Sequence, residues 1–462
     1  MQKSLQLDLF KPNYLYLNTS NSVSFNFLDL FSGIGGFRIP LEQLGGKSLG
    51  YSELDKDAIE VYHQNFIGAI NADEINLGDI TKIEEIPPDV DLIVGGVPCQ
   101  PWSVAGKGKG FDDPRGRLWF DVVRLLKKGQ PKSFIFENVR GLASPKHRKN
   151  FEYLLSQFEE VGYYTKWKFI NSYDFGIPQN RERVYIVGIR KDLETSQEYC
   201  FPQPVNKKAM LLDVIDDIKH CQLVEKAKIS PTLLFGENIP PSRNRFQKND
   251  ELNDFFVFSD LRNGHTTIHS WDLIKTTERE KLICLTILKN RRRKKYGEKD
   301  GNPLSFDDLN ELIPQLEEKE LKQLVEKKIL RIVKTPQGKK YEFVNSKNSG
   351  GINGVYRIFL PNSEMIPTLT ATGAKDYVAT VAINADDPIE YKKLFLKKIY
   401  NANKFRAITA QDACKLQGFP DWFLRHNNPE IAKKQFGNAV SVPVIYHIAK
   451  KLIEALNLSR TD

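Results

Sequence analysis

One stretch of the sequence decides the fold class: Phe25-Asn-Phe-Leu-Asp-Leu-Phe-Ser-Gly-Ile-Gly-Gly36. Residues 25–31 alternate in polarity like a β-strand, the glycines that follow form a tight turn, and residues 37–44 continue as a helix. This order is typical of the first unit of a nucleotide-binding α/β sheet, in which backbone amides at the start of the helix can hold an anion. The spacing is G-x-G-G and not G-x-G-x-x-G, so a carboxylate fits the turn better than a pyrophosphate does.

Two acidic residues follow the glycine turn at positions typical of a nucleoside site. Glu53 lies 20 residues after Gly33, at the end of a second expected strand, where a carboxylate commonly accepts hydrogen bonds from ribose hydroxyls. Asp79 closes a third strand–helix step and can receive an adenine amino group. The glycine turn alone is a weak signal, but with both carboxylates it favours a ligand that carries adenosine and an amino-acid tail.

A cysteine follows the next apolar strand, in Asp91-Leu-Ile-Val-Gly-Gly-Val-Pro-Cys99. This strand delivers Cys99 to the carboxyl edge of the sheet, where reacting groups gather in open α/β folds. A lone cysteine is more often a buried core residue. Residues 105–117 favour the catalytic interpretation, because their alternating glycines allow movement and their two lysines and two arginines attract phosphate. A solvated surface loop is the alternative.

Two later strands carry charged residues. Residues 133–139 form an apolar strand that contains Glu137, and burial of such a carboxyl group raises its pKa and suits it to donate a proton. A helix cap or a salt bridge is the alternative. Arg181 and Arg183 lie two apart on another expected strand, so their side chains point to the same side and suit a planar ligand or a phosphate. A surface salt-bridge pair is the competing interpretation.

Composition limits the class of protein. The formal charge of +9 indicates an anionic partner, with nucleic acid as the leading candidate. The five cysteines are odd in number and form no C-x-x-C pair, which argues against a disulfide framework or a structural zinc site and for a reducing compartment. No apolar run reaches the roughly 18 residues of a membrane helix, and no signal peptide is evident, so we expect a cytoplasmic protein.

From about residue 201 the α/β rhythm stops. Residues 277–290, 305–313 and 317–328 have helical patterns, and residues 329–334 and 340–344 have strand patterns, which is the order of a winged helix. Acidic and basic residues balance in the third helix, so we do not expect it to enter a DNA groove. The run Arg291-Arg-Arg-Lys-Lys295 is the better candidate for phosphate contacts, with a solvated charge run as the alternative.

Five segments in order resemble the motifs of the DNA (cytosine-5) methyltransferases, most closely the bacterial members that accompany restriction enzymes. They are Phe27-Leu-Asp-Leu-Phe-Ser-Gly-Ile-Gly-Gly36, Gly95-Gly-Val-Pro-Cys-Gln-Pro-Trp-Ser103, Phe136-Glu-Asn-Val139, Gln179-Asn-Arg-Glu-Arg183 and Gln435-Phe-Gly-Asn438. The resemblance implies an α/β, Rossmann-like sheet of the S-adenosylmethionine-dependent methyltransferases with a smaller inserted target-recognition domain. We expect a catalytic domain over 22–203, the target-recognition domain over 204–431 and a returning C-terminal segment over 432–462.

The resemblance also implies roles for single residues. Cys99 is the expected nucleophile, Glu137 contacts and protonates the cytosine ring, and Arg183, with Arg181 nearby, holds the base. The expected S-adenosylmethionine site comprises Phe31, Gly33, Gly35, Gly36, Glu53, Asp79, Ile80, Pro98, Leu118, Asn438 and Val440. The expected DNA contacts, drawn from the motifs, the charged loop and the basic run, are Gln100, Ser103, Lys107, Lys109, Arg115, Arg117, Arg291, Arg292, Arg293, Thr368 and Thr370.

The implied reaction explains these residue types. Addition of a thiolate to carbon 6 of cytosine makes carbon 5 nucleophilic towards a sulfonium methyl group, and the base must leave the duplex to react. No metal is required, and the P-C-x-x-C of zinc deaminases is absent around Cys99. The expected partners are double-stranded DNA and a restriction endonuclease acting on the same site, and we expect a monomer. Two alternatives stay open, namely a transfer-RNA cytosine-5 methyltransferase and a non-catalytic DNA-binding relative.

Overall fold

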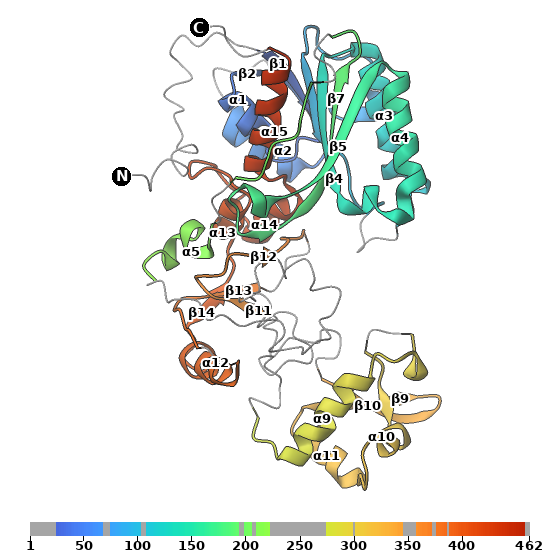
Figure 1. Cartoon of the computed structure of the whole chain (residues 1–462), viewed down its shortest axis with the longest axis vertical. Coiled ribbons are helices and arrows are strands. Elements are labelled where there is room, and N and C mark those ends of the chain that lie inside the picture. The colour runs from blue at the N-terminus through green and yellow to red at the C-terminus, as the bar shows by residue number, and fades with distance from the viewer. Residues whose placement is uncertain are drawn as a thin grey trace. The chain divides into compact units, whose positions relative to one another are not determined.

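The computed structural model of the chain describes residues 25–67, 74–102, 108–193, 198–205, 209–221, 274–298, 301–344, 357–371, 376–385 and 388–457. The chain divides into two compact units (Figure 1). Unit 1 comprises Met1–Asp216, Glu364–Ala374 and Thr409–Asp462, and unit 2 comprises Asp217–Ser363 and Lys375–Ile408. These limits do not coincide with the expected domain boundaries at 204 and 432. Among the described residues, no helix combines the length and the apolar character needed to cross a bilayer.

Unit 1 is built on a mixed sheet of six strands in the order β2-β1-β3-β4-β7-β5. The strands are β1 (Phe25–Leu30), β2 (Gly46–Ser52), β3 (Leu92–Gly96), β4 (Ser133–Val139), β5 (Tyr163–Asn171) and β7 (Glu182–Arg190). Strands β2, β1, β3 and β4 pair in parallel, whereas β7 pairs antiparallel with both of its neighbours. The carboxyl ends of the parallel strands therefore meet at one edge, as the glycine turn and the apolar runs predicted.

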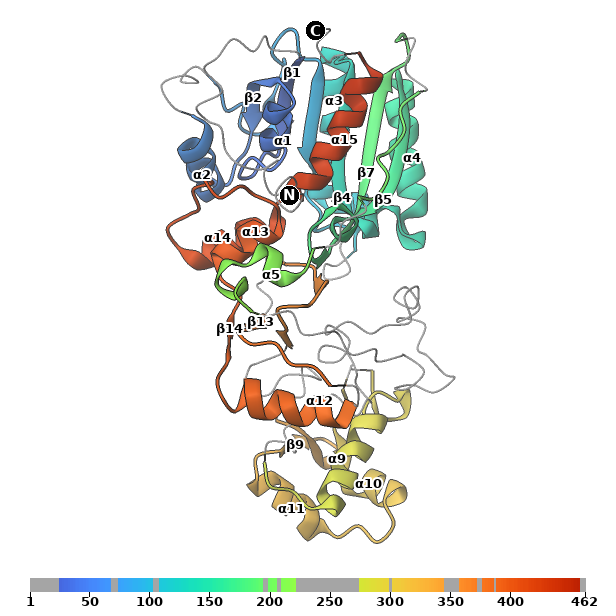
Figure 2. The same cartoon turned by 60° about the vertical axis from the view of Figure 1, so that its left-hand side comes forward.

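Helices cover both faces of this sheet (Figure 2). One face packs against α3 (Pro114–Gly129) and α4 (Arg148–Glu160), and the other against α1 (Arg38–Gln43) and α15 (Val442–Ala455). Burial on both faces explains the apolar run in strand β4. Its side chains alternate between the two cores, with Phe134 and Phe136 on the α3/α4 side and Ile135 on the α15 side. Helix α2 (Lys56–Phe66) is capped at its N-terminus by Asp55, whose side chain accepts hydrogen bonds from two backbone amides.

The C-terminal part of unit 1 is joined to the sheet through short elements and buried amides. The elements are β6 (Gln179–Asn180), α5 (Leu211–Val214), β12 (Ile366–Pro367), α13 (Ala410–Leu416) and α14 (Pro429–Asn438). The fully buried side chain of Gln179 donates to the Leu416 carbonyl at 2.7 Å and accepts from the Leu369 amide at 3.0 Å. Thr409 caps α13, because its side chain accepts a hydrogen bond from the Asp412 amide. Three distant segments thus meet at β6.

Unit 2 contains a small domain whose element order confirms the predicted winged helix. It consists of α9 (Glu278–Asn290), β8 (Leu304–Ser305), α10 (Phe306–Leu312), α11 (Glu318–Glu326), β9 (Leu330–Thr335) and β10 (Gly338–Phe343). The strands form an antiparallel sheet in the order β8-β10-β9. Strand β8, which is only two residues long, was not predicted. The domain has its own core, to which Ile283, Leu309, Leu324 and Tyr341 belong.

The rest of the described part of unit 2 is a second small sheet and a helix. Strands β11 (Arg357–Phe359), β13 (Asp376–Ala379) and β14 (Phe405–Ala407) form the sheet, with β13 in the middle. Helix α12 (Pro388–Phe395) continues as a π-helical turn, Leu396–Tyr400. Arg406 on β14 forms an ion pair with Asp217, the first residue of unit 2, with 2.5 Å between nitrogen and oxygen.

Candidate active site

The thiol of Cys99 lies at the carboxyl edge of the sheet, on a loop that is held from two sides. The β3–β4 register pairs Gly96 with Glu137, so the chain leaves β3 beside that carboxyl group and reaches Cys99 three residues later. The buried side chain of Asn138 donates to the Val97 carbonyl at 2.9 Å. The buried Trp102 donates its backbone amide to the Cys99 carbonyl at 3.0 Å. The cysteine is half-buried.

Glu137 and Arg183 form an ion pair beside this thiol. The antiparallel β4–β7 register places Glu137 opposite Tyr185, and Arg183 is a diagonal neighbour on the same face. The Nε of Arg183 lies 3.1 Å from Oε1 of Glu137, and the two side chains are only 14% and 9% exposed. Because β7 runs antiparallel to β4, the side chain of Glu137, the candidate proton donor, meets that of Arg183, the candidate residue for holding the cytosine.

Burial has the largest effect on the pKa values of Glu137 and Cys99. It raises the pKa of the Glu137 carboxyl, although Arg183 and Arg181 oppose that effect. Burial also raises the pKa of the Cys99 thiol, the charge of Glu137 adds to this, and the two arginines lower it. Burial thus favours the protonated form of the carboxyl group more than water does, and deprotonation of the thiol depends on nearby positive charge.

Arg181 has a different environment from Arg183. It is 3% exposed, and its guanidinium donates to the carbonyls of Leu369 and Gly437 at 3.2 Å and of Ala439 at 2.7 Å. Burial and the neighbouring Arg183 lower its pKa to about 9. We expected Arg181 to help hold the base. These contacts instead make it a positioning residue that fixes three segments of unit 1 around Arg183.

The glycine turn has the form of a ligand cradle. Phe31 and Gly33 both have left-handed φ angles, of 54° and 55°, and such strain in a non-glycine residue is typical of functional sites. A Cβ atom on Gly33 would meet nothing within 4 Å, whereas one on Gly35 would lie 2.2 Å from the Phe66 ring. One side of the turn is thus open and the other is packed.

Glu53 is fixed beside this turn by backbone amides. Its Oε2 accepts from the Gly33 amide at 2.9 Å, and its Oε1 accepts from the amides of Leu54 and Asp55 at 2.7 and 2.8 Å. A carboxylate has about four acceptor positions, so it can still accept from hydroxyl groups. Within the described residues, the buried carboxyl of Asp29 and hydroxyl of Ser32 have no hydrogen-bond partner. A cradle with these acceptors fits a ligand that carries hydroxyls and an ammonium group.

The other residues expected to bind the cofactor differ in their packing, hydrogen bonds and burial. Val440 packs on the turn, because a Cβ on Gly36 would lie 2.9 Å from its Cγ2 and one on Gly96 would lie 3.9 Å from its Cγ1. The Asp79 carboxylate accepts from the amide and hydroxyl of Thr81, which lowers its pKa. Pro98 and Leu118 are half-buried, Ile80 is buried in the core, and Asn438 is exposed at the end of α14.

The expected DNA contacts near Cys99 differ in their availability. Gln100 and Lys109 are exposed. Arg115 is engaged by Asp113 through two bonds of 3.0 and 2.8 Å, and Arg117 donates to the Phe111 carbonyl at 3.1 Å. Ser103 and Lys107 lie outside the described residues. In the C-terminal part, the Thr368 hydroxyl donates to the Asn180 carbonyl at 2.6 Å, and Thr370 is exposed.

The basic run of unit 2 requires a correction. Arg291 is only 3% exposed, and its guanidinium lies over the Phe343 ring, 5.6 Å from the ring centre. It therefore stabilises the small domain and is not available to a phosphate. Arg292 is half-buried and Arg293 is exposed, so the run is not a uniform cationic surface.

Several residues that shape the site were not predicted. Asn138 holds the cysteine loop, Gln179 joins β6 to the C-terminal segments, and Asn76 accepts from the Glu53 amide at 3.2 Å. Asn138 and Gln179 stand inside the quoted motifs, so their sequence positions offered a signal. Asn76 offered none, because its contact depends on an isolated bridge between Tyr51 and Asn76.

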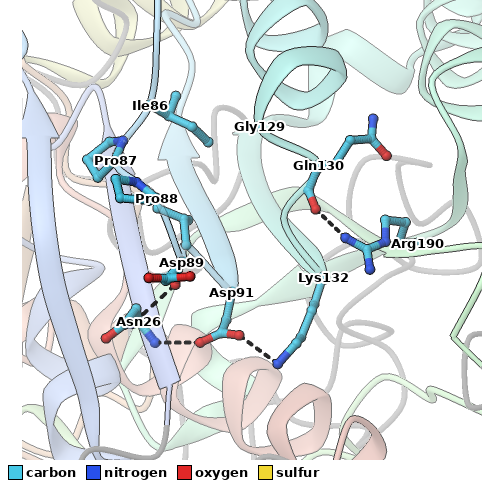
Figure 3. Close-up of a pocket in the computed structure, with 11 residues that line it drawn as sticks. Asn26, Ile86, Pro87, Pro88, Asp89, Asp91, Gly129, Gln130, Lys132 and Arg190 are labelled. Atoms are coloured by element: carbon cyan, nitrogen blue, oxygen red, sulfur yellow. Dashed lines mark hydrogen bonds and ion pairs between the residues drawn. The ribbon is translucent and has the colours of Figure 1, made fainter.

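A cavity of about 450 Å³ lies at the opposite, amino-terminal edge of the sheet (Figure 3). Asp91, which lines it, accepts from the Asn26 amide at 2.8 Å and pairs with Lys132 at 2.8 Å. Arg190 donates there to the Gln130 carbonyl. These charges are already compensated, and the cavity lies away from the edge that carries Cys99.

A sheet with a reversed strand, a glycine cradle with a fixed carboxylate, and a thiol beside a buried Glu–Arg pair are the features of an α/β methyltransferase. The sequence matches the family described as C-5 cytosine-specific DNA methylase over residues 25–454. The chain belongs to this family.

Individual relatives agree with this assignment. The chain is 46% identical over 428 residues to the type II methyltransferase M.HgiBI of Herpetosiphon aurantiacus, covering 93% of this chain and 96% of the relative. It is 32% identical to the type II methyltransferase M.NlaIV of Neisseria lactamica, covering 93% and 99%. The solved structure of the Entamoeba histolytica methyltransferase EhMeth has a TM-score of 0.50 at 15% identity, covering 93% and 98%, which supports the fold alone.

Proposed function

We propose that the chain is the modification enzyme of a restriction-modification system, which methylates carbon 5 of a specific cytosine in duplex DNA through a covalent bond to Cys99. The observation that carries this proposal is the placement of Cys99 beside the ion pair of Glu137 and Arg183, 3.1 Å apart, at the carboxyl edge of the sheet. Each of the three groups has a defined task in this chemistry.

S-adenosylmethionine is the proposed cofactor, and when bound it supplies an electrophilic methyl group. Glu53 has acceptor positions suited to the ribose hydroxyls, and Asp29 is a buried acceptor in the strand that leads into the glycine turn. Phe31, Gly33, Gly35 and Gly36 form the cradle, and Val440 closes it from the C-terminal segment. Asp79, Ile80, Pro98, Leu118 and Asn438 are the remaining candidate contacts.

Cys99 begins the reaction as a thiolate that adds to carbon 6 of the cytosine. This addition moves electron density to carbon 5, which otherwise is a poor nucleophile. Glu137 gives its proton to ring nitrogen 3, so negative charge does not build up on the ring. Burial, which raises the pKa of Glu137, favours the protonated form that this step requires. Once carbon 5 carries the methyl group, its proton leaves to solvent, the thiolate departs from carbon 6 and nitrogen 3 returns its proton to Glu137, which restores the neutral aromatic ring.

Arg183 holds the base in this scheme. Its guanidinium can donate to the exocyclic oxygen of cytosine while its charge lowers the pKa of Cys99. Arg181 keeps the surrounding segments in place through its three carbonyl contacts. Because carbon 6 cannot be reached inside a stacked duplex, the cytosine must be flipped out. Gln100, Lys109 and Thr370 are exposed candidates for contacts to the DNA.

We further propose that unit 2 selects the target sequence, and that the enzyme acts in the cytoplasm as a monomer beside an endonuclease of the same specificity. Along the sequence, unit 2 is inserted between motif-bearing segments of unit 1, and it contains a winged-helix domain with its own core. A domain with an independent core can change its surface residues without disturbing the catalytic unit.

A duplex that contains 5-fluorocytosine tests the proposal. Fluorine cannot leave carbon 5 as a proton does, so the adduct should persist and mass spectrometry should find the Cys99 peptide bonded to the modified base. Cys99→Ala should form no adduct while still binding DNA, and Cys200→Ser, at an exposed cysteine, should behave like the wild type. Transfer to transfer RNA but not to duplex DNA would favour the RNA alternative. Binding without transfer to either would favour the non-catalytic one.

A further inference from the structure

The β9–β10 hairpin of the winged-helix domain carries two lysines that face each other. Lys334 on β9 and Lys339 on β10 are directly opposite in the antiparallel register, and both are exposed. Side chains so placed have Cβ atoms about 4.5–5.5 Å apart, and like charges at such positions destabilise a hairpin. Within the described part of the chain, neither lysine forms an ion pair that would relieve this repulsion.

Several other cations of the domain, including those on α11, are neutralised by carboxylates. On α11, Lys319 pairs with Glu317 at 2.5 Å and Lys322 lies 3.7 Å from Glu318. Further pairs are Lys327–Glu280, Arg279–Glu320, Lys295–Glu311 and Arg331–Glu342, at 2.6 to 2.9 Å. The lysines at the start of α11 are therefore neutralised, whereas Lys334 and Lys339 at the hairpin tip form no ion pair among the described residues.

The packing of the hairpin shows that its tip lies beyond the core. On the face that carries the two lysines, the pair Leu330 and Phe343 is buried. In the next pair, Tyr341 is 2% exposed and belongs to the core, whereas Ile332 is 41% exposed. The lysine pair follows one step further out. The tip consequently contributes nothing to the apolar core, and its lysines are available to a ligand.

Protection of a sheet edge does not explain why the two lysines face each other. Lysines on edge strands prevent pairing with other chains, and β9 is an edge strand, so this could account for Lys334. Strand β10 pairs with β8 only at Lys340 and Tyr341, so Lys339 lies past the end of β8, but protection of that edge does not require its ammonium group to face that of Lys334.

We propose that Lys334 and Lys339 together bind one phosphate group of the DNA backbone, so that the hairpin tip, and not α11, is the phosphate contact of this domain. The inference rests on the proposed function, because it takes duplex DNA as the ligand. A phosphate between two ammonium groups turns their repulsion into attraction, and it fixes the position of the domain on the duplex without reading its sequence.

The test compares the salt dependence of DNA binding by the full chain and its variants. Lys334→Ala/Lys339→Ala should lower the slope of log affinity against log salt by about 1 and weaken binding about tenfold at moderate salt, equally for target and non-target duplexes. Lys319→Ala/Lys322→Ala removes the same charge from α11 and should leave the slope unchanged. Lys334→Arg/Lys339→Arg should restore the wild-type slope.

Thermal unfolding without DNA provides a second measurement. Loss of the opposed lysines should leave the melting temperature unchanged or raise it, because a repulsion is removed. A wild-type slope in Lys334→Ala/Lys339→Ala, with the fold intact, would overturn the inference. Failure of the proposed function would be seen separately, as absence of methyl transfer by the wild-type protein, and it would not alter the comparison of slopes.

Discussion

The Nε of Arg183 lies 3.1 Å from Oε1 of Glu137, and the two charges act in opposite directions on the thiol of Cys99. Arg183 lowers the pKa of that thiol, whereas Glu137 and burial raise it. The thiolate is the reactive form of a cysteine, so in the proposed mechanism this ion pair influences the nucleophile as well as the flipped base. The proposed mechanism thereby couples proton donation and nucleophilic attack in one site.

The first prediction concerns this coupling. Glu137→Gln should shift the alkylation of Cys99 by iodoacetamide to lower pH, because a negative neighbour is lost, and Arg183→Ala should shift it to higher pH. Methyl transfer by Glu137→Gln should fall about 10²- to 10⁴-fold. Mass spectrometry of the Cys99 peptide measures the alkylation, and the exposed Cys200 in the same sample serves as control. Identical profiles in all three proteins would contradict the coupling.

The second prediction separates the two arginines. Arg181→Lys should lower the free energy of unfolding by about 3 kcal/mol, because one ammonium group cannot serve three buried carbonyls. Arg183→Lys should cost less than about 1 kcal/mol but slow single-turnover methylation about 100-fold, since the planar donor to the base is lost. Denaturant titration and rapid-quench assays measure the two effects. A fully stable Arg181→Lys protein would remove the positioning role.

The third prediction concerns the support of the cysteine loop. Asn138→Ala leaves the Val97 carbonyl without its donor, which should lower the free energy of unfolding by about 1–3 kcal/mol. The rate of methylation should fall about tenfold because Cys99 is less well placed, while cofactor affinity measured by calorimetry stays the same. If stability falls and the rate does not, Asn138 supports the fold and not the nucleophile.

The sequence predicted the sheet of unit 1 because its strands are apolar enough to be recognised one by one. Strand β4, with Phe134 and Phe136 in one core and Ile135 in the other, shows how burial on both faces produces such a run. The quoted motifs predicted Cys99, Glu137 and Arg183 as one site. They could not supply its geometry, because the contact of Glu137 with Arg183 depends on the reversed direction and register of β7.

Other features depend on contacts that a linear pattern does not contain. Arg291 belongs to a basic run, but its position after α9 turns it onto Phe343 and into the core. The strands β8 and β12 have two residues each and exist only through their pairing with β10 and β6. Arg181 and Arg183 look equivalent in sequence, and only the approach of residues 369 and 437–439 distinguishes them.

The last prediction concerns Asp29, a fully buried carboxyl group in the strand that leads into the glycine turn. Its two oxygens have no hydrogen-bond partner within the described residues, and burial raises its pKa well above the usual value, with Glu53 and Glu74 adding to the effect and Arg38 opposing it. A raised pKa in the folded state means that folding holds a proton that the unfolded chain releases. The stability associated with Asp29 is therefore complete below pH 4 and declines as pH rises through the folded-state pKa. Asp29→Asn removes this titration, so its stability relative to the wild type should rise between mildly acidic and neutral pH. Urea unfolding of both proteins without cofactor at several pH values measures the difference, and a difference that does not change with pH would show that Asp29 is ionised in the folded protein.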